Sequence, residues 1–468
     1  MQEINLLDSP NIKHIHFIGI GGISMSGLAE ILLNLGYKIS GSDIKASGVT
    51  EKLEKMGIKI NTYHSKENIQ NPDLVVYTAA VRESNPELAY ARELNIPVID
   101  RATLLGLIMK RYPQSIAVSG THGKTTTTSM ITMILLNSGL DPTVHIGGEL
   151  DAIGGSTKIG GKNYFITEAC EYVESFLKFH PYLAVVLNID ADHLDYFRDI
   201  EHIKDAFHKF LSLVPENGYV VGCADDKNTL ELINKLSCNK ITYGLKSSEA
   251  LWTARDIRFD ASGCGAFNVF CRNEFFAEIK LNVPGIHNVN NALAAIAACH
   301  TIGCSADAIK LGLSEFFGTH RRFEQKGIVE GIRVVDDYAH HPSEVKATLK
   351  AARNSSHTRI WCVFQPHTYT RTRALLDEFA AAFTDADVVL LADIYAAREA
   401  DTGDIHSGML AEKINGLGQE AIYLRNFESI VDHLVKNSLP GDLVLTMGAG
   451  DIYRVGEMFL NRKEKALA

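Results

Sequence analysis

A glycine-rich loop containing a lysine has the composition of a phosphate-binding site. The segment SIAVSGTHGKTTTTSM begins as an apolar strand, passes through Gly120, Gly123, Lys124 and Thr125, and then continues as a helix. In such loops backbone N–H groups face anionic oxygens, the lysine neutralises the outer phosphates, and a hydroxyl such as Thr125 ligates magnesium. Val118 stands where the usual spacing has its first glycine, so a turn that merely caps a helix is the alternative. The candidate residues are Gly120, Thr121, His122, Gly123, Lys124, Thr125 and Thr126.

A second glycine loop, GIGGISMSGLAEIL, lies near the start of the chain between an expected strand and an expected helix. Gly21 and Gly22 allow a pyrophosphate to approach the backbone, and Asp43 follows the next strand at a distance suited to a ribose hydroxyl. Ser24 replaces the third glycine of the dinucleotide pattern. The loop is compatible with NAD, FAD, a UDP-sugar, or only a tight contact between helix and strand.

Acidic residues follow two further apolar strands, in TEACEYVESF and in LAVVLNIDADHLDYF. Ligands gather at the carboxyl ends of parallel strands, and hard oxygen atoms suit magnesium. We therefore expect these side chains to meet the phosphates held by the lysine loop. The candidates are Glu168, Asp190, Asp192, His193 and Asp195. A solvated acidic turn is the alternative, and it is favoured for Asp195.

Basic and acidic residues also follow two strands in the last third of the chain, in DDYAHHP and in FQPHTYTRTR. Arginine with histidine suits a carboxylate-bearing substrate and phosphoryl charge. Any one of these residues alone is more often part of a surface loop than a ligand. The candidates are Asp336, Asp337, His340, His367, Arg371 and Arg373.

The elements that must position these residues alternate between short apolar runs and helical patterns, which is typical of βαβ units with parallel sheets. A chain of 468 residues exceeds one ordinary core, and roughly 150 residues per domain predicts about three domains. We expect an α/β fold with a Rossmann-like domain at 1–110, a central phosphate-loop domain at 111–318 and a Rossmann-like domain at 319–468.

Composition excludes several classes of protein. The formal charge of −10 argues against a general nucleic-acid or anionic-membrane surface. No basic n-region with a long apolar run occurs at the start and no stretch of 18 apolar residues occurs anywhere, so we expect a cytoplasmic protein. The eight cysteines are scattered without a C-x-x-C pair, which indicates reduced thiols. The sequence does not decide between a monomer and a homodimer.

Taken in order, the motifs resemble those of the Mur ligases across essentially the whole chain. The matching segments are the glycine loop at 19–27, GTHGKTT, NIDADHLD, PGIHNVNNALAA, HRRFE, DDYAHHPSE, QPHTYTRTR and GAGDI. Ligases that add later amino acids and folylpolyglutamate synthetases share the central loop, but are not expected to share DDYAHHP together with FQPHTYTRT. The resemblance implies ATP-dependent joining of L-alanine to the carboxylate of UDP-N-acetylmuramate through an acyl phosphate, in peptidoglycan synthesis.

The resemblance also implies roles for individual residues. Lys124 and Thr125 would hold ATP phosphates and Mg²⁺, and Glu168 and His193 would hold metal ions, which makes Lys124, Glu168 and His193 the expected catalytic group. The residues implied for the nucleotide are Asn288, Asn291 and Arg322, with Asp337 at the domain hinge. Those implied for UDP-N-acetylmuramate are Gly21, Gly22, Ser42 and Asp43, and those for L-alanine are His367 and Arg371. Cys170 departs from the family's E-A-D-E-S motif, as Ser24 does from the glycine loop.

Three other functions stay open at this point. Another Mur-type ligase of a related UDP-muramyl acid would use the same central loop. An NAD-dependent oxidoreductase would use the first glycine loop, but it leaves the lysine loop and the acidic cluster without a role. A binding protein switched by slow ATP hydrolysis would use Lys124 and would need neither His367 nor Arg371.

Overall fold

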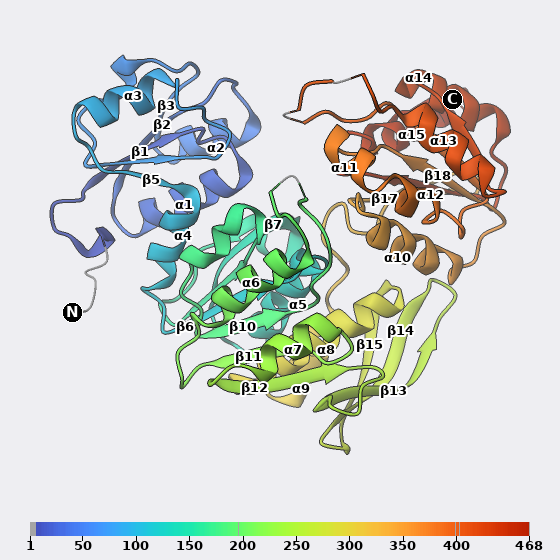
Figure 1. Ribbon diagram of the computed structural model, residues 1–468, viewed down its shortest axis with the longest axis horizontal. Coiled ribbons are helices and arrows are strands. Elements are labelled where there is room, and N and C mark those ends of the chain that lie inside the picture. Colours follow the sequence, from blue (N-terminus) through green and yellow to red (C-terminus); the bar gives the residue numbers. More distant parts are fainter. Residues whose placement is uncertain (1–5, 195, 398, 402, 468) are drawn as a thin grey trace. The chain divides into compact units, whose positions relative to one another are not determined.

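The computed structural model describes residues 6–194, 196–397, 399–401 and 403–467, in which helices pack against three β-sheets (Figure 1). The expected α/β class with three domains is confirmed, since every sheet contains parallel strands joined through helices. By its internal contacts the chain divides into two compact units. Unit 1 comprises Met1–Ile189, Lys204–Thr242 and Ala297–Cys304, and unit 2 comprises Asp190–Ile203, Tyr243–Ile296 and Ser305–Ala468. The predicted domain boundaries stay predictions.

The first sheet, in unit 1, has five parallel strands in the order β3-β2-β1-β4-β5. The order reverses beside β1, and in such sheets ligands bind outside the carboxyl ends of the strands at this point. The side chains of Ser47, Asn85 and Asp100 accept hydrogen bonds from the first turns of three of its helices and fix where those helices begin. The elements are β1 His14–Ile18, α1 Ile23–Asn34, β2 Lys38–Ser42, α2 Gly48–Lys55, β3 Lys59–Asn61, β4 Leu74–Tyr77, α3 Pro86–Glu93, β5 Val98–Asp100 and α4 Arg101–Met109.

The second sheet has ten strands in the order β15-β14-β13-β12-β11-β10-β6-β9-β7-β8. In unit 1, β6 pairs in parallel with both β9 and β10, and Val118 lies opposite Glu168. The lysine loop and Glu168 therefore both lie at the carboxyl ends of adjacent parallel strands. The elements are β6 Gln114–Ser119, α5 Lys124–Asn137, β7 Thr143–Leu150, β8 Gly155–Lys158, β9 Tyr164–Glu168, β10 Leu183–Val186, α6 Ile200–Leu211, β11 Tyr219–Cys223, α7 Lys227–Asn234, β12 Asn239–Gly244, β13 Trp252–Phe259, β14 Cys264–Cys271, β15 Glu274–Pro284, α8 Ile286–Thr301 and α9 Ala306–Ser314.

The third sheet, in unit 2, has six strands in the order β16-β17-β21-β18-β19-β20. Alternate residues of its buried strands enter two separate apolar clusters; Cys362 and Phe364 join one, and Val363 joins the other. Both faces are thus covered, as parallel strands require. The elements are β16 Glu324–Val329, β17 Ile332–Asp337, α10 Pro342–Arg353, β18 Ile360–Phe364, α11 Tyr369–Ala374, α12 Leu376–Ala380, β19 Val388–Leu391, α13 Ser407–Gly416, β20 Glu420–Tyr423, α14 Phe427–Asn437, β21 Leu443–Met447 and α15 Tyr453–Leu467.

Several strands were not anticipated from the sequence. Strands β13, β14 and β15 pair antiparallel and extend the second sheet, β7 and β8 form an antiparallel pair, and β16 adds antiparallel to β17. Apart from the start of β7, these strands contain partly or fully exposed residues along much of their length, so they lack the continuous apolar runs that mark buried parallel strands. Among the described residues, no helix combines the length and apolar character needed to cross a bilayer.

Candidate functional site

The lysine loop lies between β6 and α5, where the backbone makes a turn that glycine permits. Gly120 has a φ of 134° and Gly123, the residue before α5, a φ of 87°, a region that side-chain-bearing residues avoid. The N–H of Thr121 donates to the backbone carbonyl of Asn188 (3.1 Å). The N–H of His122 donates to the side-chain oxygen of the same asparagine (2.8 Å). The loop is thus fixed to the segment after β10, with the N-terminus of α5 at its end. Such a terminus attracts anions.

Lys124 is the first residue of α5, and its side chain turns back over the loop. The ammonium donates to the carbonyls of Gly120 (2.5 Å) and Thr121 (3.1 Å) and to the carboxylate of Glu171 (3.0 Å). Burial lowers the pKa of Lys124, but the charge of Glu171 outweighs burial and raises it above the usual lysine range. The lysine is therefore a fixed positive charge at the place where the sequence predicted phosphate neutralisation.

Thr125 and Glu168 meet beside this lysine. The hydroxyl of Thr125 donates to one carboxylate oxygen of Glu168 (3.0 Å), and the N–H of Gly147 donates to the other (2.7 Å). A hydroxyl and a carboxylate are the hard oxygen donors that Mg²⁺ prefers, so this pair fits the predicted metal site. His193 belongs to unit 2 and the other two residues to unit 1. Its part in the same metal site therefore stays a prediction, and Asp195 lies outside the described residues.

The first glycine loop gathers its predicted residues at the carboxyl ends of β1 and β2. The N–H of Gly21 donates to the carboxylate of Asp43 (2.8 Å). A Cβ on Gly21 would lie 2.9 Å from that same oxygen, so the close approach requires glycine. Gly22 caps α1. Ser42 is fully buried and its hydroxyl donates to Glu87 (2.7 Å), so it lies beneath the loop. Contact of these residues with a sugar nucleotide stays a prediction.

A buried carboxylate under this loop was missed by the sequence analysis. Glu87, on α3, is fully buried and also bonds the ring nitrogens of His16 (3.0 Å) and His64 (3.1 Å) and the amide of Asn68 (2.9 Å). Burial opposes ionisation, but the hydrogen bonds outweigh it and hold the pKa of Glu87 below its usual range. A histidine inside the apolar run HIHFIGI was the available signal, since a buried imidazole needs a polar partner.

In unit 2, the residues predicted to contact the nucleotide lie on α8 and around β17. Asn291 donates to the side-chain oxygen of Asn288 (3.0 Å), whose amide donates to the carbonyl of Pro284 (2.7 Å). Asp337, at the end of β17, accepts the N–H of Phe323 and that of Ala339, both at 2.8 Å. Arg322 was also predicted to contact the nucleotide, and its guanidinium lies 5.0 Å from the ring centre of Tyr338.

The electrostatics of Asp337 follow from its position. Burial raises the pKa of Asp337 to about 6, against the opposing charge of Arg322 and the two backbone N–H groups. The carboxyl group therefore titrates near pH 6, closer to neutral pH than an ordinary aspartate, which the sequence did not indicate.

The pair predicted to place the amino acid, His367 and Arg371, lies at the end of β18. One guanidinium nitrogen of Arg371 is 3.3 Å from Nδ1 of His367, and two others donate to Oδ1 of Asp192 (3.1 and 3.2 Å). Burial, with the charges of His340 and Arg371, lowers the pKa of His367 to about 4, so the imidazole is neutral at pH 7. Arg371 thus has an internal carboxylate partner, Asp192. From the sequence, Asp192 was expected to lie with the magnesium ligands.

Asp192 itself is held in its charged form. Burial would raise its pKa, but Arg371 outweighs burial and keeps the pKa of Asp192 well below the usual range. Arg371 and Asp192 therefore form a buried ion pair within unit 2, with side chains 11% and 8% exposed.

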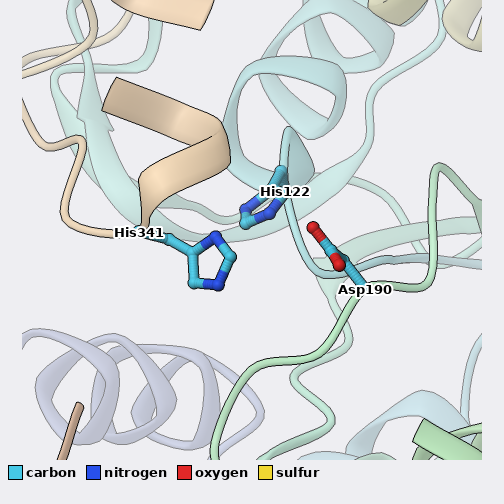
Figure 2. A group of neighbouring side chains, drawn as sticks. All are labelled: His122, Asp190 and His341. Atoms are coloured by element: carbon cyan, nitrogen blue, oxygen red, sulfur yellow. The ribbon is translucent and has the colours of Figure 1, made fainter. Parts of the chain in front are cut away.

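Asp190 and His341 are neighbours in unit 2, and Figure 2 shows both side chains, with His122 of unit 1 also drawn. A carboxylate oxygen of Asp190 and a ring nitrogen of His341 lie within 4.8 Å of one another. The hydroxyl of Ser343 donates to Asp190 (2.8 Å), and His341 bonds the carbonyl of Ala191 (3.1 Å). His341 was not among the predicted residues, although it stands in the DDYAHHP segment.

Three family models match the chain in succession. Residues 14–113 match the "Mur ligase family, catalytic domain", residues 118–299 the "Mur ligase middle domain", and residues 321–450 the "Mur ligase, glutamate ligase domain".

Individual proteins match over nearly their full length. The UDP-N-acetylmuramate–L-alanine ligase of Acetivibrio thermocellus is 68% identical, with 99% of both chains covered. That of Caldanaerobacter subterraneus is 56% identical, covering 98% of this chain and 100% of the relative. The crystal structure of the UDP-N-acetylmuramate–alanine ligase of Thermotoga maritima matches with a TM-score of 0.81 at 33% identity, covering 97% and 99%. The chain therefore belongs to the Mur ligase family.

Proposed function

We propose that this chain is an ATP-dependent ligase that joins L-alanine to the carboxylate of UDP-N-acetylmuramate in peptidoglycan synthesis, in the cytoplasm. The observation that carries the proposal is the loop of unit 1, where Lys124 stands at a helix N-terminus and the Thr125 hydroxyl meets the Glu168 carboxylate. The relatives that are 68% and 56% identical bear this activity in their names, which supports the same substrates here.

The reaction needs two steps because a carboxylate is a poor acyl donor. In the first, a carboxylate oxygen attacks the γ-phosphorus of ATP, the bond to ADP breaks, and an acyl phosphate forms. In the second, the amine of L-alanine attacks the carbonyl carbon, the bond to phosphate breaks, and the nitrogen loses a proton. Lys124 and the backbone N–H groups at the start of α5 stabilise negative charge as the phosphoryl group moves.

The metal site of the proposal is built on oxygen donors. Thr125 and Glu168 would hold Mg²⁺, with His193 as a further ligand. When bound, the ion draws negative charge from the phosphate oxygens. The proposed phosphate contacts also include the other residues of the loop, Gly120, Thr121, His122, Gly123 and Thr126. The remaining proposed nucleotide contacts are Asn288, Asn291, Arg322 and Asp337.

The two other substrates have separate sites in the proposal. Gly21, Gly22 and Asp43 take the sugar nucleotide, with Ser42 beneath them. Arg371 takes the carboxylate of L-alanine with His367 beside it. Because Arg371 already bonds Asp192 through Nε and Nη2, the alanine carboxylate would use its remaining N–H groups. A planar guanidinium presents enough donors for both partners.

A product assay tests the proposal directly. The protein is incubated with ATP, magnesium, UDP-N-acetylmuramate and single amino acids, and the products are weighed by mass spectrometry while phosphate release is followed. The proposal expects phosphate release only when both the sugar acid and L-alanine are present. Lys124→Ala should abolish it. Lys235→Ala is the matched control, since this lysine is exposed in the same unit and pairs with Glu231 at the surface.

Three results would contradict the proposal in whole or in part. Phosphate release that needs neither UDP-N-acetylmuramate nor an amino acid indicates a protein switched by ATP hydrolysis. A reaction that requires NAD indicates an oxidoreductase. Ligation of a different amino acid in place of L-alanine would agree with the proposed reaction class but contradict the proposed amino-acid substrate.

A further inference from the structure

The ammonium group of Lys124 has no hydrogen left to offer a ligand. An ammonium carries three N–H donors. Here the acceptors are the carbonyl oxygens of Gly120 and Thr121 and the carboxylate of Glu171, whose two oxygens lie 3.0 and 3.3 Å from the nitrogen. A phosphate that binds Lys124 must therefore displace one of these partners.

Glu171 is held in place by the segment that follows it. Its side chain is 3% exposed. The next turn, Tyr172–Lys178, is anchored by Phe176, whose ring stacks on Phe210 with centroids 4.6 Å apart. Val173 and Glu174 within this turn have φ values of 49° and 54°, a conformation that costs roughly 1–2 kcal/mol per residue and persists only where packing enforces it. The carboxylate of Glu171 is thus not free to move into water.

The neighbouring acidic groups, Cys170 and Glu168, have no hydrogen bond to this nitrogen among the contacts of Lys124 with Gly120, Thr121 and Glu171. Burial raises the pKa of the Cys170 thiol to about 11, so this side chain is neutral at pH 7. The carboxylate of Glu168 bonds the Thr125 hydroxyl and the Gly147 N–H, and it acts on Lys124 through its charge. Glu171 is therefore the carboxylate in direct contact with Lys124.

We propose that Glu171 is a positioning residue that competes with bound phosphate for Lys124, weakens the hold of the loop on ADP, and so favours product release. The proposal rests on the proposed function, since it takes the loop to be the nucleotide site. In the empty site Glu171 orients the charged lysine and pairs with it. In the filled site the lysine turns to phosphate, and a buried carboxylate is left beside an anion.

The charge on Glu171 sets the size of the effect. Two like charges a few ångströms apart in a partly buried site repel by about 1–4 kcal/mol. Replacing the carboxylate by the neutral amide of the same shape removes this repulsion and weakens the competing hydrogen bond. We expect Glu171→Gln to bind ADP at least about tenfold more tightly, which corresponds to about 1.4 kcal/mol. A residue with only a structural role would change affinity in the opposite direction.

The test measures ADP binding by calorimetry, with magnesium present, in the full-length protein. Glu171→Gln and Glu171→Ala should both tighten ADP, and ADP should become a stronger product inhibitor of ligation. Glu231→Gln is the matched control, because it removes a lysine-paired carboxylate from α7 in the same unit and should leave ADP affinity unchanged. Unchanged or weaker binding in both Glu171 variants overturns the proposal. So does failure of both to fold, since a carboxylate that the fold requires does not serve to tune affinity.

A double-mutant cycle separates competition for the lysine from direct repulsion. In a Lys124→Met background, Glu171→Gln should tighten ADP binding clearly less than it does in the unaltered protein, because competition for the lysine is gone and only the repulsion remains. A tenfold tightening that survives in this background overturns the competition. Absence of ADP and ATP binding to the unaltered protein is a different result, because it overturns the proposed function itself.

Discussion

The buried carboxylate of Glu87 stabilises the first sheet, and its removal is expected to destabilise that sheet locally. One carboxylate oxygen accepts bonds from His16 and Ser42. The other accepts bonds from His64, the N–H of Ser65, and Asn68. These partners come from β1, β2, and the segment between β3 and β4, so a single side chain joins distant parts of the sheet. The perturbation is Glu87→Ala.

The magnitude follows from the donors left behind. A buried donor without an acceptor costs roughly 1–3 kcal/mol, and removing one partner of a buried charged network typically costs about 3–5 kcal/mol in total. Water entering the space offsets part of this, so we expect a loss of about 3–4 kcal/mol. Glu87→Gln should cost less, about 1–2 kcal/mol, because its oxygen still accepts from Asn68 and the N–H of Ser65, and hydroxyl and imidazole groups reorient.

Hydrogen exchange measures this loss where it occurs. The amides of β1 and β2 exchange through local opening of the first sheet, so their protection reports that sheet without requiring the whole chain to unfold in one step. A loss of 3 kcal/mol corresponds to a fall in protection of about a hundredfold. Glu83→Gln is the matched control, since Glu83 is an exposed carboxylate just before α3 that pairs with Arg92. Protection in Glu87→Ala equal to that in the control would refute the reasoning.

Three further predictions concern the proposed sites. Lys124→Ala should abolish ligation and change the Kd for UDP-N-acetylmuramate by less than about tenfold, roughly 1.4 kcal/mol, in calorimetry; a larger change would show that the two sites are not separate. Arg371→Lys keeps the charge and loses the fork that holds Asp192, so the KM for L-alanine should rise more than that for ATP, and equal rises would contradict the assignment. Asp337 has a folded pKa of about 6 against an ordinary value of 3.8, so the stability it contributes is complete below pH 3.8 and is lost as pH rises through 6. The unfolding free energy of Asp337→Asn minus that of the unaltered protein should therefore rise by up to about 3 kcal/mol from pH 4 to 8 in urea titrations, and a difference independent of pH would contradict the shift.

The sequence predicted the parts of the molecule in which residue type and local spacing carry the information. The lysine loop followed from glycines, a lysine and a helix pattern within a few residues, and the placement of Glu168 beside it followed from its position at the end of an apolar strand. In the structure β6 and β9 are adjacent, and Thr125 bonds Glu168.

The sequence could not predict partners that only the folded chain brings together. Lys124 and Glu171 are 47 residues apart, and Arg371 and Asp192 are 179 apart. Neither pairing follows from a local pattern, since an isolated glutamate or aspartate in a loop is usually solvated. The antiparallel strands β13 to β15 were missed for a related reason. One face of each is partly or fully exposed, and their alternating pattern is weaker than the apolar run of a buried strand.

The place of β6 in the second sheet has a consequence for how the chain tolerates change. Strand β6 is hydrogen-bonded on both sides, to β10 and β9, whereas β15 and β8 end the sheet. An insertion or deletion at either end strand disturbs one neighbour at most, and a register slip in β6 would displace two strands together with the loop that follows it. Variation in length should therefore accumulate at the margins of this sheet, which leaves the phosphate loop unchanged while new surface is added around it.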